Sequence, residues 1–183
     1  MYKKHKGFTV VQLVIAMVIF AILTGIGITG YQQHARRADV ETASNDLRIF
    51  GNNYEDAVAD IGYVFWEKGA TDAKEKVKEY LKELQEVYMN CEFNIDERLE
   101  FVDFGTDHYG FTVDMKEEKD PWGLMYRMVY IINQNTGKAD NIYFASAGPN
   151  STWVEYIEGS NTYLSEKYDD DIILAMTVRE INK

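Results

Sequence analysis

The chain has 183 residues and a formal net charge of −11, with 30 acidic against 19 basic side chains. An acidic balance of this size argues against non-specific binding of nucleic acid, so no nucleic-acid partner is expected. Hydrophobic residues make up 46% of the chain and aromatic residues 14%, enough to build a packed core and to exclude a disordered protein.

The first predicted element is an apolar segment, residues 7–33, which contains no charged side chain. Lys3, Lys4 and Lys6 stand directly before it. A hydrocarbon core about 30 Å thick requires roughly 20 apolar residues in a helix, so the segment is long enough to span a bilayer. The lysines favour a cytoplasmic amino terminus, which predicts an acidic head outside the cytoplasmic membrane, formed by residues 34–183.

Three interpretations of this amino-terminal segment compete. A cleaved secretory signal has an apolar region of about 7–15 residues and a small-residue cleavage site. Here the apolar region is longer, and no clear Ala-x-Ala site follows it. A simple signal anchor fits the hydropathy equally well, and the third interpretation rests on a family resemblance.

Residues 6–13 (KGFTVVQL) and the apolar run that follows resemble the class III signal of type IV pilins and type II secretion pseudopilins. In that family a short basic leader ends in glycine and precedes a Phe-Thr-Leu-Ile-Glu-Leu sequence. The resemblance implies that a prepilin peptidase removes residues 1–7 by cutting between Gly7 and Phe8, and methylates the new Phe8 amine. Residues 8–33 are then expected to serve first as a transmembrane helix and later as filament core.

The chain departs from the family pattern at Gln12, where the family usually has glutamate. That carboxylate is thought to neutralise the terminal amine of a neighbouring subunit. Glutamine removes both the attraction and the cost of burying a charge, although its amide still forms hydrogen bonds. Two interpretations remain open: a minor or tip subunit, or a variant system with weaker control of register.

A second departure is Thr29, which stands where the family often has proline. Gly25, Gly27 and Gly30 interrupt the apolar run instead. Each glycine weakens a helix interior by roughly 1 kcal/mol relative to alanine, which would let the helix bend or melt locally during assembly. The alternative is close packing between membrane helices, where small residues are also favoured.

Beyond the apolar segment the spacing predicts that the helix continues to about Asp60. Apolar residues recur there at intervals of three and four: Val40, Ala43, Leu47, Phe50, Tyr54, Val58 and Ile61. This stripe is typical of an amphipathic helix packed against a core. Coiled-coil association is the alternative, but fewer than four clean heptads are present.

A second, surface helix is predicted from Thr71, as its N-cap, to about Met89, with an apolar stripe opposed by lysines and glutamates.

The single cysteine, Cys91, excludes an intramolecular disulfide framework. No histidine lies near it in the sequence, so we expect a small buried hydrophobic residue and not a reactive thiol.

From about Arg98 the pattern predicts strands. Residues 99–104 and 108–113 flank a Gly-Thr-Asp sequence, which indicates a hairpin. Residues 126–133 and 141–146 predict a second hairpin, and residues 172–181 a last strand. We therefore expect an α+β fold in which the long amino-terminal helix packs against an antiparallel sheet.

The carboxy-terminal half extends the resemblance. Residues 120–123 (DPWG), Tyr126, residues 146–150 (SAGPN) and residues 169–172 (DDDI) follow one another in the order seen in the major pseudopilins of type II secretion. Together with the amino-terminal signal, the resemblance covers both ends of the chain and implies a pilin-like fold. Residues 63–119 and 151–168 carry none of it.

In the pseudopilins late aspartates help to hold calcium, and the resemblance implies the same role for Asp169, Asp170 and Asp171. The Ser146 hydroxyl and nearby carbonyls would complete the six to eight oxygens that calcium requires. The family loop is shorter, and Ser151 replaces its glycine here. The alternative is that three adjacent acids are simply solvated; no other cofactor is expected.

No catalytic motif is found in the sequence: there is no Gly-rich phosphate loop, no His-Glu-x-x-His and no paired Cys/His ligand set. We therefore expect a non-enzymatic structural subunit of a type IV pilus or of a type II secretion pseudopilus-like filament. Its partners would be other pilin or pseudopilin subunits, a prepilin peptidase and the membrane assembly platform. The alternatives are a membrane-anchored extracellular binding protein that does not polymerise and a tethered enzyme with an unrecognised site.

Overall fold

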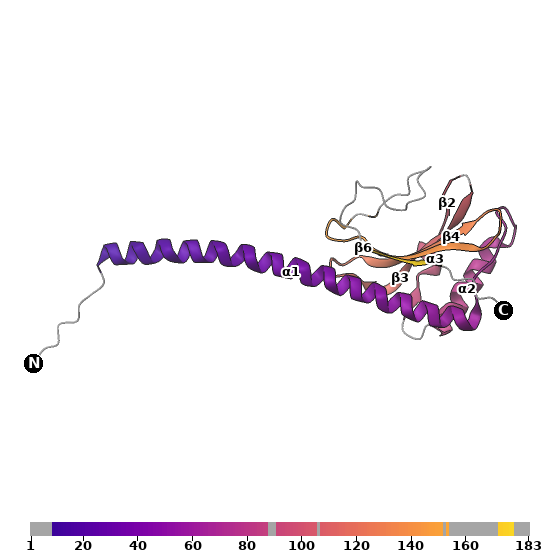
Figure 1. Cartoon of the computed structure of the whole chain (residues 1–183), viewed down its shortest axis with the longest axis horizontal. Coiled ribbons are helices and arrows are strands. Elements are labelled where there is room, and N and C mark those ends of the chain that lie inside the picture. The colour runs from indigo at the N-terminus through magenta and orange to yellow at the C-terminus, as the bar shows by residue number, and fades with distance from the viewer. Residues whose placement is uncertain (1–8, 88–90, 106, 152, 154–171, 178–183) are drawn as a thin grey trace, which may run out of the picture. The chain divides into compact units, whose positions relative to one another are not determined.

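The structure is a computed structural model, and it describes residues 9–87, 91–105, 107–151, 153 and 172–177. The chain divides into two units, Met1–Asp39 and Val40–Lys183. The second unit contains the head, an α+β arrangement of helices on an antiparallel sheet. Figure 1 follows the elements along the chain by label and colour.

The long amino-terminal helix is present as predicted: α1 comprises Val10–Ile61. Within the head its buried residues are Ala43, Leu47, Phe50, Tyr54, Ala57 and Val58, which follow the predicted stripe at intervals of three and four. The stripe is shorter than predicted at its start, because Val40 is 40% exposed. The helix ends at Ile61, and Gly62 follows it with a φ of +82°, a left-handed conformation that suits a glycine after a helix.

The second helix, α2, comprises Ala73–Val87. It buries Val77, Tyr80, Leu81 and Leu84 and turns its lysines and glutamates outward, as its stripe predicts. It begins later than expected, so Asp72 and not Thr71 directly precedes its first residue. The Asp72 carboxylate pairs with Lys76 at 2.9 Å, one turn further along the chain.

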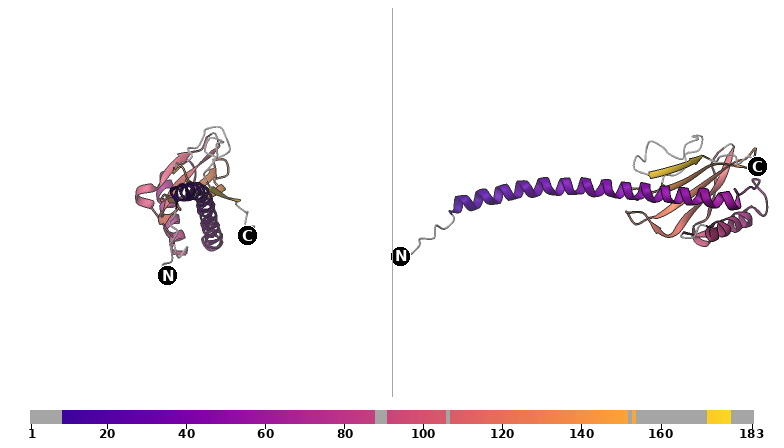
Figure 2. Two further views of the ribbon diagram at one scale, coloured as in Figure 1. Left: turned by 90° about the vertical axis from the view of Figure 1, so that its left-hand side faces the viewer. Right: turned by 60° about the horizontal axis from the view of Figure 1, so that its bottom comes forward.

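Within the described part of the head, six antiparallel strands form the sheet: β1 (Glu92–Phe93), β2 (Glu100–Asp103), β3 (His108–Lys119), β4 (Met125–Asn133), β5 (Ala139–Ser146) and β6 (Ile172–Thr177). The strand order is β1-β3-β4-β5-β6, and β2 also pairs with β3. A short helix, α3 (Ile95–Arg98), connects β1 to β2. Figure 2 shows the sheet and α2 from two further directions.

Both predicted hairpins are confirmed. In the first, β2 pairs with β3 from Glu100↔Thr112 to Asp103↔Tyr109. In the second, β4 pairs with β5 from Arg127↔Ala145 onward. The last strand occupies the first part of the predicted range 172–181, and residues 178–181 lie outside the described residues.

Gly110 in β3 sits where no side chain fits. A Cβ placed there would overlap the backbone carbonyl of Tyr130 and would lie 3.1 Å from the Phe104 ring. The backbones of β3 and β4 approach so closely at this point that only glycine is compatible with the register.

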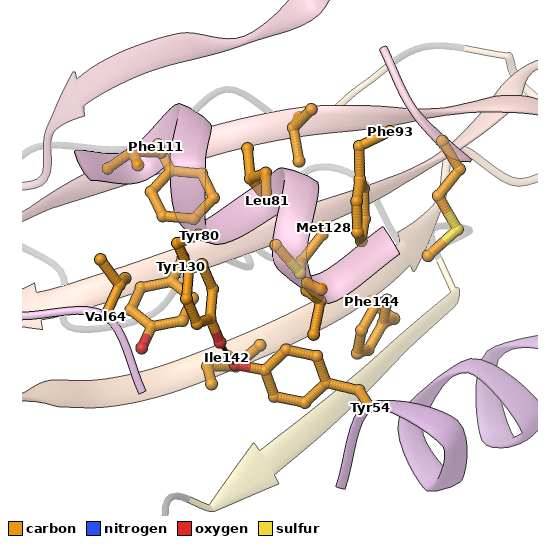
Figure 3. Packing of buried hydrophobic residues seen from close by; sticks show 14 of the residues in the cluster. Tyr54, Val64, Tyr80, Leu81, Phe93, Phe111, Met128, Tyr130, Ile142 and Phe144 are labelled. Atoms are coloured by element: carbon orange, nitrogen blue, oxygen red, sulfur yellow. Dashed lines mark hydrogen bonds between the residues drawn. The ribbon is translucent and has the colours of Figure 1, made fainter. Parts of the chain in front are cut away.

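The main core lies between the helices and one face of the sheet. Alternate residues of β3, β4 and β5 point into it, among them Phe111, Met128, Tyr130 and Phe144, because successive side chains of a strand face opposite sides. Figure 3 shows how these side chains meet those of α1 and α2. All residues drawn there belong to a single cluster, so both helices cover the same face of the sheet.

Aromatic contacts and one buried hydrogen bond join the helices to each other and to the sheet. The hydroxyl groups of Tyr54 on α1 and Tyr80 on α2 lie 2.9 Å apart, which satisfies two buried polar groups at once. The Tyr54 ring meets the Phe144 ring edge to face at 5.7 Å. Burial raises the pKa of both tyrosines well above 10, so they stay neutral hydrogen-bonding groups.

Candidate functional site

The amino-terminal unit presents an exposed apolar surface. Every side chain of residues 9–28 is exposed. Its large hydrophobic residues include Phe20 at 72% and Leu23 at 63% exposure. Among the described residues, α1 is the one helix long and apolar enough to cross a membrane. This surface is the candidate assembly segment, residues 10–33.

Gln12 closes the first turn of α1 together with Thr9. The backbone N–H of Thr9 donates to Gln12 Oε1 at 3.0 Å, and the backbone N–H of Gln12 donates to Thr9 Oγ1 at 3.3 Å. These reciprocal bonds form a capping box, which satisfies two donors that a helix start leaves unpaired. Gln12 therefore has a role within its own chain, at the position predicted to act in assembly.

The three glycines predicted to affect assembly, Gly25, Gly27 and Gly30, all lie within the uninterrupted α1. The space that a Cβ would occupy is open at each of them. Just before them, the Thr24 hydroxyl donates to the Phe20 carbonyl at 2.7 Å, a bond to the preceding turn that often accompanies helix bending. The helix therefore contains residues that lower its stiffness without breaking it.

Ser146, one of the predicted calcium ligands, is fully buried at the end of β5. Its hydroxyl donates to Asp120 Oδ2 at 2.7 Å and accepts from the Gly148 N–H at 3.1 Å. The bond to Asp120 holds the turn after β5 against the turn before β4, and the bond from Gly148 closes the turn after β5 itself. The hydroxyl thus already serves the packing of the head.

Asp120 is the centre of this polar cluster, although it is only 4% exposed. Its Oδ1 accepts from the backbone N–H groups of Trp122 and Leu124, at 3.1 and 2.9 Å. A further backbone bond, from Gly123 N–H to the Asp120 carbonyl, closes the turn of residues 120–123. Three donors on one buried carboxylate provide the hydrogen bonding that a buried charge requires.

The remaining predicted site residues lie outside the described residues. These are the cleavage-site pair Gly7 and Phe8 and the aspartates Asp169, Asp170 and Asp171. Among the residues the structure does describe, no group of three or more His, Cys, Asp or Glu side chains is arranged to hold a metal. The calcium site therefore stays a prediction.

Cys91 is buried, as expected, and lies at the edge of the main core. Burial raises the pKa of its thiol to about 12, and the carboxylates of Glu118 and Glu92 act in the same direction. Because the thiolate is the reactive form, this environment suppresses nucleophilic chemistry at neutral pH.

On the opposite face of the sheet, a buried ion pair joins β3 to β4. Arg127 Nε donates to Asp114 Oδ1 at 2.6 Å, and the guanidinium lies 4.4 Å from the centre of the Trp153 ring. The guanidinium lies over the Trp153 ring, and the ion pair is largely removed from solvent. Both conditions suit arginine better than lysine. His108 begins β3 and contacts Asp140 at 2.9 Å near the surface.

Two of these arrangements differ in how readily the sequence signals them. Thr9-Val-Val-Gln12 before an apolar run has the spacing of a capping box, so the Thr9 partner of Gln12 was available to sequence reasoning. The pairing of Asp120 with Ser146 joins residues 26 positions apart and depends on the register of β4 and β5.

Comparison with protein-family models, with characterised proteins and with solved structures found no match to this chain.

Proposed function

We propose that this protein is a structural subunit of a filament of the type IV pilus or type II secretion pseudopilus kind, assembled from the membrane through α1. One observation carries the proposal. The same helix is apolar and exposed over residues 10–28 and buries a one-sided stripe in the head from Ala43 to Val58. A helix that is apolar all round suits lipid or a bundle of like helices, whereas a one-sided stripe suits packing under a head.

Several further features support the proposal. The head is an α+β fold whose antiparallel sheet packs on α1, which agrees with the coarse layout of pilins. The Gly7-Phe8 junction follows three lysines and precedes the charge-free segment, as processing by a prepilin peptidase requires. In this proposal the head lies outside the cytoplasmic membrane, and the partners are further subunits and the membrane assembly platform.

Gln12 favours a minor or tip subunit within this proposal. A neutral amide that bonds to Thr9 of its own chain offers no charge to the terminal amine of a neighbour. Gln12→Glu keeps the capping geometry and adds that charge, so we expect it to raise incorporation into filaments. Quantifying wild-type and variant subunits in sheared filaments tests this; equal incorporation would show that the carboxylate is dispensable.

The decisive experiment is the mass of the mature protein. The protein is expressed in cells that contain a prepilin peptidase, and its amino terminus is sequenced by mass spectrometry. We expect a chain that begins at a methylated Phe8, and Gly7→Asn as a cleavage-site control should retain Met1. A wild-type chain that keeps Met1 would overturn the filament proposal and favour a membrane-anchored binding protein that does not polymerise.

Calcium at Asp169, Asp170 and Asp171 is a separate part of the proposal. A metal that binds only the folded state stabilises it by mass action, so excess chelator should lower the melting temperature of the head. The triple change of these residues to asparagine should remove the chelator effect. A melting temperature that chelator leaves unchanged in the wild type would remove calcium from the proposal.

A further inference from the structure

Arg36 and Arg37 end the long charge-free part of the chain. No charged side chain occurs between Lys6 and Arg36. Both arginines are exposed, and within the described part of the chain neither forms an ion pair. They follow the exposed residues 31–34 (YQQH) and the partly buried Ala35.

Helix geometry sets the depth of these arginines in a bilayer. The helical residues from Val10 to Ala35 number 26, which at about 1.5 Å per residue corresponds to about 39 Å. A bilayer measures about 40–45 Å with its head groups. If Val10 lies near one surface, Arg36 and Arg37 lie at the level of the phosphates on the other. Tyr31 then lies at the boundary that tyrosine prefers.

The chemistry at this depth matches the side chains. Arginine presents a planar fork of donors that binds phosphate oxygens through two bonds, and its long stem lets it reach along the helix. Adjacent residues project about 100° apart around a helix, so the two guanidinium groups contact different lipids. We infer that Arg36 and Arg37 bind the phosphate groups of phospholipids in the leaflet facing the head.

The inference rests on the membrane-spanning part of the proposed function, and it adds a consequence. Removal of residues 1–7 takes away Lys3, Lys4 and Lys6, the basic side chains on the cytoplasmic side. The arginine pair is then the one group of basic side chains adjoining the apolar segment. It holds the processed subunit in the membrane from the head side, and it must release its lipids when the subunit enters a filament.

Solid-state NMR tests the contact directly. The full chain, labelled with ¹³C at the arginine guanidinium carbons, is reconstituted into vesicles of phosphatidylethanolamine and phosphatidylglycerol in phosphate-free buffer. Lipid is then the source of phosphorus, and ³¹P dephasing of the arginine signal reports direct contact. The chain has six arginines, so about one third of the signal should dephase.

Variants assign the effect. The double change Arg36→Gln and Arg37→Gln should abolish the dephasing, each single change should halve it, and Arg48→Gln on the head part of α1 should leave the dephased signal intact. Absence of dephasing in the wild type, or its persistence in the double variant, would overturn the inference. Dephasing in a chain that retains Met1 supports the lipid contact and refutes the filament proposal. Conversely, a chain that is processed and forms filaments but shows no ³¹P dephasing of its arginine signal refutes the lipid contact and leaves the filament proposal intact.

Discussion

The two parts of α1 use apolar residues in opposite ways. In the assembly segment, residues 10–33, large hydrophobic side chains surround the helix and are exposed. In the head, apolar side chains follow one face and are buried, while the opposite face carries charges such as Arg48 and Glu55. The spacing of apolar residues therefore reveals the buried face of α1 only where the helix packs against other elements of its own chain.

The two parts of α1 differ in whether their apolar side chains stabilise the folded chain. Burying the head stripe stabilises the fold, at about 25 cal/mol per Å² of apolar surface. The assembly segment contributes nothing of this kind until lipid or other helices cover it. Under the proposed function, mutations in the head should therefore act on its stability, and mutations in the segment on membrane insertion and assembly.

The largest expected difference is in cysteine chemistry. In the folded Gln33→Cys variant, held in detergent micelles at pH 8, Cys91 should react with iodoacetamide about two to three orders of magnitude more slowly than the new, exposed thiol. The reason is the raised pKa of Cys91, about 12 against an ordinary 9.0. Mass spectrometry of the two labelled peptides measures the ratio, which should approach one in denaturant.

The same pKa predicts a pH dependence. Because the folded chain holds the Cys91 proton more tightly than the unfolded chain, its contribution to stability is complete below pH 9 and is lost as the pH rises toward 12. Cys91→Ala should flatten this part of the stability profile. Comparable labelling of both thiols in the folded chain would contradict the burial of Cys91.

Two identical substitutions compare the parts of α1 most directly. Leu47 is 2% exposed and Leu23 is 63% exposed. Leu47→Ala should lower the free energy of unfolding of the head by about 2–5 kcal/mol, because it leaves a cavity in the core. Leu23→Ala should change that free energy by less than about 0.5 kcal/mol.

Urea unfolding of the full chain in micelles measures both Leu variants. Tryptophan fluorescence reports on the head alone, because Trp66, Trp122 and Trp153 all lie there. If Leu23→Ala destabilised the head as much as Leu47→Ala, the separation of the two roles would be wrong.

A smaller effect is expected from the buried polar cluster of the head. Asp120→Ala removes an acceptor from three donors and should lower the free energy of unfolding by about 2–3 kcal/mol. Asp120→Asn keeps the oxygen that binds the two backbone N–H groups, so its cost should be about 1 kcal/mol. The same urea titration distinguishes the two variants. Equal losses of unfolding free energy would indicate that the hydrogen bonds from Trp122 and Leu124, which asparagine keeps, do not stabilise the head.

The smallest effect belongs to the start of the assembly segment. Thr9→Ala breaks one half of the capping box and should weaken the first turn by about 1 kcal/mol. Hydrogen exchange at the Gln12 amide should then be about five times faster, whereas Thr9→Ser should leave it unchanged. Unfolding of the head should not respond, and a response there would mean that the two parts are energetically coupled.

Much of the fold is readable from the sequence because it follows from local periodicity. The helical stripe from Ala43 to Val58 and both hairpins have the expected residues. The elements that escaped prediction, β1 and α3, contain two and four residues. Segments that short show no periodicity, and their conformation depends on the strand beside them.

The site was less predictable than the fold. The burial of Cys91 followed from the character of the residue, and the Thr9–Gln12 capping box has a local signature. The misplaced edges, Val40 and Thr71, reflect the low reliability of element boundaries. The bonds of Asp120 to Ser146 and of Asp114 to Arg127 join residues brought together by register, which local patterns do not encode.

The hydrogen bond from the Tyr126 hydroxyl to Asp46 on α1, at 2.8 Å, joins residues 80 positions apart. A ribosome that adds roughly 5–20 residues per second needs about 4–16 s to progress from one to the other. During that interval the buried face of α1 has been synthesised and its sheet has not. The strands of the head therefore fold onto a helix that was synthesised before them, and the apolar stripe of α1 lacks its partner sheet until β4 has been made.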